Sequence, residues 1–305
     1  MSSSHEKVHN ILRKLPAIGK LISELDSVLV ERNHLREERD LYLKKSQMLD
    51  SLLKEREAAQ NPAADLNRRR RRILTESEVQ RYKARIDEYD KRQKWFHSMN
   101  LGNGLWTSGF ATKEALDHRI RSLHIPDDLT GMTFLDVASW DGYYAFEAEA
   151  RGASRVLATD YFCWAGEGSG SKEGFLLARE ILGSKVEDKN IEVYDLSPTT
   201  VGMWDIVLFS GIFYHMRDPI RAMHAAASVA NTCMIVETHI DYNNMSEPTM
   251  RYIPRTPGNE SSNYWRPNPA MILVLLNEMG FSRVDHRIAI EGLKSSTHGF
   301  FNAYR

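Results

Sequence analysis

Thr133-Phe-Leu-Asp-Val-Ala-Ser-Trp-Asp-Gly-Tyr-Tyr-Ala-Phe146 is the stretch that decides the fold. It starts with a short apolar run that ends at Asp136, continues through a turn to Gly142, and then begins a helical pattern. A buried parallel strand delivers its carboxyl end to a crevice, and the helix after it presents unpaired N–H groups there. Gly142 lets the backbone approach a ligand closely. This order of strand, loop and helix predicts a nucleotide-type site.

A second apolar run, Val156 to Asp160, also ends in an acid. An acid at the tip of a second strand can hold both hydroxyls of a ribose. The Gly-x-Gly-x-x-Gly pattern of dinucleotide sites is missing, because Ala138 and Trp140 stand where small residues would be. The two strands therefore predict a ligand that has a ribose but no phosphate.

The composition limits the architecture and the compartment. A chain of 305 residues, 42% hydrophobic and 27% charged, can bury one full α/β core with about a hundred residues left over. Cys163 and Cys233 have no histidine partners at metal spacing, so we expect reduced thiols and no metal site. The first residues contain no apolar signal region, and no apolar run approaches eighteen residues. These features predict a cytoplasmic protein without a membrane partner.

Charge is distributed unevenly along the chain. Residues 1–100 contain 22 Lys and Arg against 16 Asp and Glu, whereas the remaining 205 contain 18 against 25. An acidic catalytic domain does not favour unaided binding to a phosphate backbone. Any nucleic-acid partner would therefore be attracted by the basic N-terminal part.

Residues 1–60 form the first predicted segment, with a long helix over 10–57. One apolar seam repeats every seven residues, whereas its companion seam is only half apolar. A short coiled coil that makes a homo-oligomer is one interpretation, and a charged helix that packs along its own catalytic domain is the other. The complete seam consists of Leu21, Val28, Leu35, Tyr42 and Leu49.

Residues 61–94 form the second predicted segment, a basic linker and a capped helix. Asn61-Pro62 breaks the first helix, and Arg68 to Arg72 are five consecutive arginines. Such a run is typical of a solvated linker, and it also suits phosphate contacts to RNA. Thr75 and Glu78 form a capping box that begins a helix ending near Trp95.

Residues 95–305 alternate between strands and helices, which predicts a Rossmann-like, doubly wound, seven-stranded α/β sheet. We expect helices after the first two strands, helices that begin at Asp218-Pro219 and Asn268-Pro269, and a closing hairpin. The seven predicted strands are 133–136, 156–160, 191–197, 205–210, 233–238, 281–289 and 299–304.

The chain from about Trp95 onward resembles the class I S-adenosylmethionine-dependent methyltransferases. In particular it resembles the tRNA wobble-uridine methyltransferases, which make 5-methoxyuridine and 5-carboxymethoxyuridine, and their many uncharacterised bacterial relatives. The resemblance covers about two thirds of the chain, and S-adenosylmethionine is the cofactor that it implies. The motifs that carry it are Trp95-Phe-His-Ser, Leu101-Gly-Asn-Gly, Leu135-Asp-Val-Ala-Ser-Trp-Asp-Gly, Gly211-Ile-Phe-Tyr-His-Met-Arg-Asp-Pro, Trp265-Arg-Pro and Met279-Gly-Phe.

We expect the cofactor to lie along the predicted strand ends. Asp136 would orient the loop and the methionine amine, and Asp160 would hold the ribose. The resemblance places Asp195, with Leu196, at the adenine. The predicted cofactor residues are Asp136, Ala138, Gly142, Asp160, Asp195, Leu196 and Ser210.

Methyl transfer is an in-line displacement, so the enzyme must align a nucleophile and remove its proton, without a metal. His215 follows the fourth predicted strand and has a side chain suited to a general base, with Tyr214 packed near the methionine portion. Alternatively, His215 caps or packs against the helix that begins at Asp218. Glu237 and His239, at the end of the fifth strand, are lesser candidates for the floor of the site.

The acceptor should meet two segments. The connection from His239 to Pro267 is long enough to be a binding loop, and the resemblance implies that the segment around Trp95 to Trp106 closes over the site. The carboxymethyl-transferring branch uses lysine in this second segment, whereas residues 95–110 contain neither Lys nor Arg, which favours plain methyl transfer. The predicted substrate residues are Trp106, Tyr252, Arg255 and Trp265.

Three functions stay open at this point. The favoured one is O-methylation of a small-molecule or glycan hydroxyl, which suits the acidic domain. Methylation of a tRNA wobble-uridine hydroxyl is the alternative, and it suits the motifs and the arginine run. A catalytically silent coiled-coil scaffold is the third, and the acids at the strand ends disfavour it.

Overall fold

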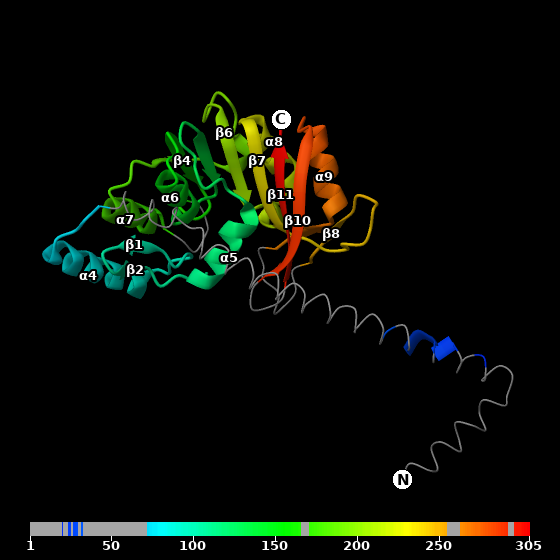
Figure 1. The fold of residues 1–305 in the computed structure, drawn as a ribbon, viewed down its shortest axis with the longest axis horizontal. Coiled ribbons are helices and arrows are strands. Elements are labelled where there is room, and N and C mark those ends of the chain that lie inside the picture. Colours follow the sequence, from blue (N-terminus) through cyan, green and yellow to red (C-terminus); the bar gives the residue numbers. More distant parts are fainter. Residues whose placement is uncertain are drawn as a thin grey trace, which may run out of the picture. The chain divides into compact units, whose positions relative to one another are not determined.

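The computed structural model describes most of the chain after residue 71 (Figure 1). The chain divides into two units, Met1–Ala64 and Asp65–Arg305. Most of the predicted coiled coil and arginines 68–71 lie outside the described residues, so both stay predictions. The described residues are 72–165, 171–254, 263–291 and 296–305, with Lys20, Glu24, Leu25, Ser27, Val28, Leu29 and Arg32, which are helical.

A seven-stranded sheet forms the centre of the second unit, in the order β10-β11-β7-β6-β3-β4-β5. Pairing is parallel from β7 to β5, and the hairpin of β10 and β11 joins β7 in antiparallel fashion. This topology confirms the predicted doubly wound sheet and its closing hairpin. The bounds are β3 Thr133–Val137, β4 Arg155–Asp160, β5 Glu187–Asn190, β6 Trp204–Ser210, β7 Ala230–His239, β10 Arg283–Glu291 and β11 Ser296–Tyr304.

Helices cover both faces of the sheet (Figure 1). Successive side chains of a strand point to opposite faces, so Phe134 joins one core and Leu135 the other. The first core includes residues of α4, α5, α6 and α7, and the second those of α8 and α9. The bounds are α4 Glu76–Arg92, α5 Lys113–Leu123, α6 Tyr143–Ala150, α7 Lys172–Leu182, α8 Pro219–Ser228 and α9 Pro269–Glu278.

Side-chain caps fix where several helices begin. The capping box of Thr75 and Glu78 forms as predicted, with both reciprocal hydrogen bonds. Asp218 caps α8 and Asn268 caps α9, each followed by a proline that suits the first helical turn. No helix among the described residues is long and apolar enough to cross a membrane.

The third predicted strand, 191–197, is wrong. β5 is Glu187–Asn190, and Val193–Asp195 form a 3-10 helix, η1. β5 is an edge strand that pairs only with β4, and its residues are polar and mostly exposed. Ile191 and Val193 belong to the connection after β5 and pack against the second core, so they are apolar. Their alternation with polar residues resembles the pattern of a strand.

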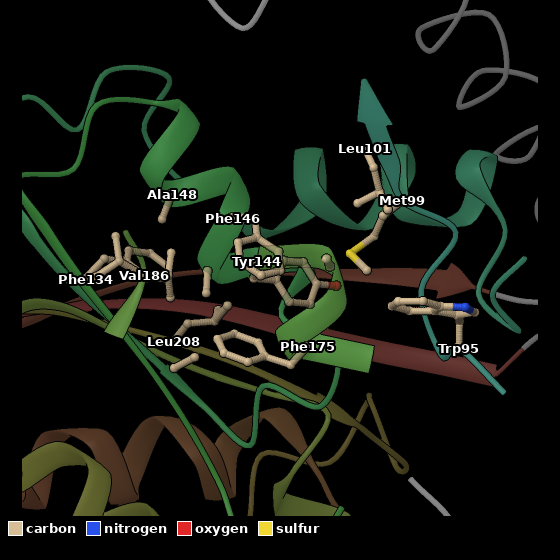
Figure 2. Close-up of a cluster of buried hydrophobic side chains, with 14 of the residues drawn as sticks. Trp95, Met99, Leu101, Phe134, Tyr144, Phe146, Ala148, Phe175, Val186 and Leu208 are labelled. Carbon is tan, nitrogen blue, oxygen red and sulfur yellow. The ribbon is translucent and has the colours of Figure 1, made fainter. Parts of the chain in front are cut away.

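Two short hairpins accompany the main sheet. β1 (Asn100–Gly102) pairs with β2 (Leu105–Trp106), and β8 (Met250–Tyr252) pairs with β9 (Trp265–Pro267). Figure 2 shows Tyr144 and Phe146 of α6 in one buried cluster with Met99 and Trp95. The segment that leads into β1 is therefore packed against α6, directly after the loop that follows β3.

Gly142 offers a test of packing at the start of α6. Its φ is +91°, and an added Cβ would lie 2.6 Å from ring carbons of Phe146 and Phe175. Gly131 has a similar φ of +81° with no heavy atom within 4 Å of such a Cβ. We expect Gly131→Ala to lower the free energy of unfolding by about 1–2 kcal/mol, and Gly142→Ala to lower it by a further ~1–3 kcal/mol of overpacking. Urea unfolding measures both, and equal losses would contradict the packing argument.

Candidate functional site

Three parallel strands deliver polar side chains to one edge of the sheet. Asp136 lies one residue before the end of β3, while Asp160 and Ser210 are the last residues of β4 and β6. These strands are neighbours, and the chain order reverses between β3 and β6. Crevices at such reversal points are where open α/β sheets bind their ligands. The structure thus brings together three of the predicted cofactor residues.

Asp136 holds the loop after β3 to the first turn of α6. The Ser139 hydroxyl donates to its Oδ2 at 2.5 Å, and the Ala145 amide donates to the same oxygen at 3.2 Å. Asp136 is only 2% exposed. Burial raises the pKa of Asp136 to about 7, although the hydrogen bond from Ser139 opposes this rise.

The loop itself has the backbone of a glycine-rich turn built from larger residues. Ala138, Trp140 and Gly142 have φ values of 55°, 51° and 91°, in the left-handed region. Left-handed conformations cost a non-glycine residue on the order of 1–3 kcal/mol unless the surroundings impose them. Here the Trp140 amide donates to Asp160 Oδ2 at 2.9 Å, which helps to hold the backbone in place.

Asp160 links the loop to the end of β4. Besides the Trp140 amide, it accepts the Cys163 amide on Oδ1 at 2.9 Å. Burial raises the pKa of Asp160, and these amide hydrogen bonds oppose the rise. The Tyr161 backbone supplies a third such hydrogen bond. A carboxylate has about four lone-pair positions, so about one remains for a further donor such as a hydroxyl.

Asp141 organises the segment around Trp95 and is not predicted from the sequence. Its Oδ2 accepts the amides of Phe96 at 2.7 Å and His97 at 3.0 Å, and its Oδ1 pairs with His97 Nδ1. Both Asp141 and His97 are buried. The only sequence signal is an extra acid directly before Gly142, and nothing in the sequence identifies its partner.

Aromatic rings reinforce this contact. Phe96 stacks on Trp140 at a centroid distance of 4.7 Å, and His97 stacks on Tyr143 at 5.4 Å. The segment predicted to close over the site is therefore fastened to the loop after β3 by both charge and stacking.

Asp195 and Leu196 lie beyond the end of β5. Asp195 ends η1 and is exposed, whereas Leu196 is 3% exposed and packs in the second core. An exposed carboxylate beside an apolar side chain can bind the edge and face of a flat ring. Their role at an adenine stays a prediction.

A second cluster lies at the ends of β6 and β7. Tyr214 and His215 belong to the 3-10 helix η2 (Phe213–His215), and His239 ends β7. The ring of Tyr214 lies 4.2 Å from that of His215 and 4.2 Å from that of His239, whose ring lies 4.3 Å from His298 of β11. His298 Nδ1 pairs with Glu237 Oε1. His215 is exposed and does not cap α8, because Asp218 does.

Glu237 is fully buried at the inner end of this cluster. Burial acts to raise its pKa, but the charge of Arg119 and the hydrogen bonds from His298 and Ser210 hold the pKa of Glu237 well below its usual range. The Ser210 hydroxyl donates to Glu237 Oε2 at 2.8 Å. Ser210 therefore connects the second cluster to the edge that carries Asp136.

His298 is not predicted from the sequence. It faces His239 in the register of β11 and β7. Its sequence signal is a histidine near the start of the final strand, which does not reveal Glu237 as its partner.

Two predicted substrate residues lie together beside the second cluster. Tyr252 and Trp265 face each other across β8 and β9 with ring centroids 5.1 Å apart, and Trp265 Nε1 donates to the carbonyl of Arg217 at 3.3 Å. The Tyr264 amide donates to the Tyr214 carbonyl at 2.7 Å, which holds β9 against η2. Trp106 is on β2, in the other hairpin, and is 42% exposed.

Arg255, the remaining predicted substrate residue, lies outside the described residues. In the part of the chain that the structure describes, no group of three or more His, Cys, Asp or Glu side chains could hold a metal ion.

Comparison with known proteins identifies the fold. No protein-family model and no curated protein matches the chain. Among solved structures, the N-terminal domain of EvdMO1, crystallised in the presence of S-adenosylhomocysteine (SAH) and D-fucose, is 18% identical, with a TM-score of 0.54. The match covers 76% of this chain and 97% of that domain.

A second similar structure is the magnesium protoporphyrin IX methyltransferase ChlM from Synechocystis PCC 6803 with bound SAH. It is 16% identical, with a TM-score of 0.44, and the match covers 63% of this chain and 82% of that one. The likeness to the EvdMO1 domain shows the Rossmann-like fold of class I methyltransferases, which confirms the predicted fold class.

Asp141→Asn should loosen the segment at Phe96 and His97. The substitution turns one acceptor into a donor that faces donors and removes a buried charge, so we expect a loss of about 3–5 kcal/mol of unfolding free energy. Faster hydrogen exchange of the Phe96 and His97 amides would locate the effect. Asp205→Asn is the control, because Asp205 binds Thr133 at the other end of β3. Unchanged exchange in Asp141→Asn would contradict the assignment.

Asp136→Asn should change how stability depends on pH. Because the pKa of Asp136 is about 7 in the folded chain against 3.8 as the reference, the folded state binds this proton more tightly. The stabilisation is complete below about pH 4 and is lost as the pH rises through about 7. When the pH rises from about 5 to about 7, the free energy of unfolding of the wild type should fall by on the order of 2 kcal/mol relative to that of Asp136→Asn. Chemical unfolding at both pH values measures this difference, and parallel pH profiles would rule it out.

Proposed function

We propose that this chain is an S-adenosylmethionine-dependent methyltransferase that methylates a hydroxyl of a small molecule or glycan. The observation that carries the proposal is the placement of Asp136 and Asp160 at the ends of adjacent parallel strands beside the chain reversal. Both carboxylates are buried, and an acidic crevice complements a cofactor that carries a sulfonium and an ammonium group. The fold of class I methyltransferases supports the same assignment.

The residues present fit this cofactor. Asp160 binds the Trp140, Cys163 and Tyr161 amides and retains about one lone-pair position for a ribose hydroxyl. Asp136, whose pKa burial raises to about 7, would be ionised by a nearby ammonium group. We expect Ala138, Gly142 and Ser210 to contact the cofactor between these acids, and Asp195 and Leu196 to contact its adenine. When bound, the cofactor supplies an electrophilic methyl group.

The remaining task of the chain is to hold the acceptor in line with that methyl group. Tyr252 and Trp265 present two aromatic rings beside η2, and aromatic faces are suited to the apolar faces of sugars. The acidic balance after residue 100 favours a neutral or cationic acceptor over an unassisted polyanion. The EvdMO1 domain was crystallised in the presence of D-fucose, and this supports a sugar as the first acceptor to test.

Methylation of a tRNA wobble uridine is the alternative outcome. Among the five consecutive arginines, Arg72 forms an ion pair with Glu78 at 2.6 Å, so one charge of the run is already partnered. Assembly of the chain through its N-terminal helix belongs to the same proposal and would be measured by sedimentation with and without residues 1–60.

Asp160→Ala should weaken cofactor binding without unfolding. Removal of an ionised acceptor costs roughly 1.5–3 kcal/mol per hydrogen bond, so the loss of one bond to a ribose hydroxyl should lower the affinity for S-adenosylmethionine by about 10- to 100-fold. Calorimetric titration measures the affinity, and circular dichroism checks the fold. Asp285→Ala is the matched control, since Asp285 is an exposed acid on β10, far along the sheet order from β4.

The acceptor is identified by transfer of a labelled methyl group to total tRNA and to a metabolite extract of the same cell. Label in a small hydroxyl-containing product supports the proposal. Label in tRNA replaces the small-molecule acceptor by the RNA acceptor, and wild-type protein that binds no cofactor refutes the methyltransferase assignment altogether.

A further inference from the structure

The hairpin of β8 and β9 carries a positive charge that the described residues do not balance. Arg251 and Arg266 are directly opposite each other in its register, and like charges in such a cross-strand pair repel each other. Asp241 neutralises Arg251, because its Oδ2 accepts hydrogen bonds from Nε at 2.9 Å and from Nη2 at 2.5 Å. Arg266 is half-buried and has no carboxylate partner among the described residues. Such a charge is costly without an anion beside it.

The charge of Arg266 acts on the second cluster. Burial lowers the pKa of His239 to about 3, and the positive charge of Arg266 is among those that lower it further. The two side chains are therefore close enough for their charges to interact. His239 is the last residue of β7, and β7, β6, β3 and β4 are parallel, so this end of β7 lies at the same edge of the sheet as Asp136 and Asp160.

Arg217, directly after η2, supplies a second positive charge. Its guanidinium carbon lies 5.5 Å from the centroid of the Tyr264 ring, and its carbonyl accepts the Trp265 Nε1 hydrogen bond. The Ile253 amide donates to the Tyr264 carbonyl at 2.7 Å, so the extended pairing of the hairpin continues to Tyr264. Side chains two residues apart in an extended segment share a face, which puts Tyr264 on the face of Arg266. Arg217 is exposed and also has no carboxylate partner in the described part of the chain.

We propose that Arg266 and Arg217 bind an oxyanion group of the methyl acceptor, so that the methylated hydroxyl belongs to an acidic small molecule such as a sugar phosphate or a sugar acid. The inference rests on the proposed function and defines its substrate class. A guanidinium group donates two parallel hydrogen bonds to a phosphate or a carboxylate, which fixes the orientation of that group as well as its position.

The charge of the proposed methyl donor favours such an acceptor. The donor carries a positive sulfonium group, and an uncompensated arginine at the same edge of the sheet disfavours its binding. An oxyanion on the acceptor neutralises the arginine, whereas a neutral alcohol leaves the repulsion in place. One oxyanion held by two arginines is also unlike an unassisted polyanion, which the acidic balance after residue 100 disfavours.

The oxyanion would anchor the acceptor through a group that does not react. The Tyr264 amide donates to the Tyr214 carbonyl at 2.7 Å, so the segment before β9 is fixed to η2. This attachment keeps the arginines in a constant position relative to the ends of β6 and β7. An anchor of this kind helps to orient the hydroxyl for in-line transfer.

The first experiment measures oxyanion binding without any activity. Inorganic phosphate is titrated into the full chain, with and without SAH, and phosphorus-31 NMR reports its affinity. The variants are Arg266→Gln, Arg266→Lys and Arg217→Gln, and circular dichroism checks that each is folded. Arg283→Gln is the matched control, because the Arg283 guanidinium also lies over a tyrosine ring, that of Tyr304, at 4.2 Å. Tyr304 pairs with Cys233 near the start of β7, at the opposite edge of the sheet.

We expect Arg266→Gln to weaken phosphate binding by about 10- to 100-fold. Arg217→Gln removes an exposed charge and should weaken it by roughly 2- to 5-fold. Arg266→Lys keeps the charge but loses the planar fork, so its affinity should lie between those of Arg266→Gln and the wild type. Arg283→Gln should bind as the wild type does. A wild type that binds no phosphate, or folded Arg266 and Arg217 variants with wild-type affinity, would overturn the inference.

The second experiment determines the charge of the natural methyl acceptor. Labelled product from the metabolite extract is passed over an anion-exchange column at neutral pH, before and after treatment with phosphatase and phosphodiesterase. Retention supports the inference; loss of retention after the enzymes identifies a phosphate, and lasting retention identifies a carboxylate. A neutral labelled product, or label in tRNA, overturns it. Calorimetry with SAH tests the proposed function separately, since a wild type that binds phosphate but not SAH refutes the methyltransferase assignment and not the oxyanion site.

Discussion

Carboxylates buried at one edge of the sheet are the constraint on which the rest of the site depends. Asp136, Asp141, Asp160 and Glu237 are each at most 4% exposed. A buried carboxylate is destabilising unless donors surround it, so the chain must bring N–H and O–H groups to this edge. The loop after β3, the segment at Phe96 and the last strand all supply such donors.

The same donors explain why larger residues replace glycines in the loop. A left-handed Trp140 is strained, but its amide binds Asp160 and its ring stacks on Phe96. Polar and aromatic contacts together offset the strain at a position where glycine would supply neither ring nor stacking. The result is a loop after β3 that also forms the wall for the segment before β1.

Local patterns predict most of the fold, because each is contained within a few neighbouring residues. The apolar runs that end in Asp136 and Asp160, the capping box at Thr75 and the caps at Asp218 and Asn268 all belong to this class. The edge strand β5 is not predicted, because a polar strand that pairs with a single neighbouring strand has no apolar pattern in its sequence.

The part of the site that the sequence does not predict consists of pairs of residues far apart in the chain. His97 and Asp141 are 44 residues apart, and Glu237 and His298 are 61 apart, so no spacing signals either pair. Asp136 and Asp160 are predictable because each lies at or next to the end of its own strand. Their partners become visible only when the sheet is formed.

The position of β11 between β7 and β10 has a consequence for the order in which the buried polar groups come together. β10 reaches the sheet only through β11, and β11 pairs with a strand far earlier in the sequence. Contacts between distant segments require a large loss of chain entropy before any stabilising interaction forms. Such contacts therefore tend to form late in folding. A chain that has assembled β3, β4 and β6 already has Asp136 and Asp160 in place while Glu237 still lacks its histidine. The acids at the ends of β3 and β4 and the pair of Glu237 and His298 are thus assembled at separate stages of folding.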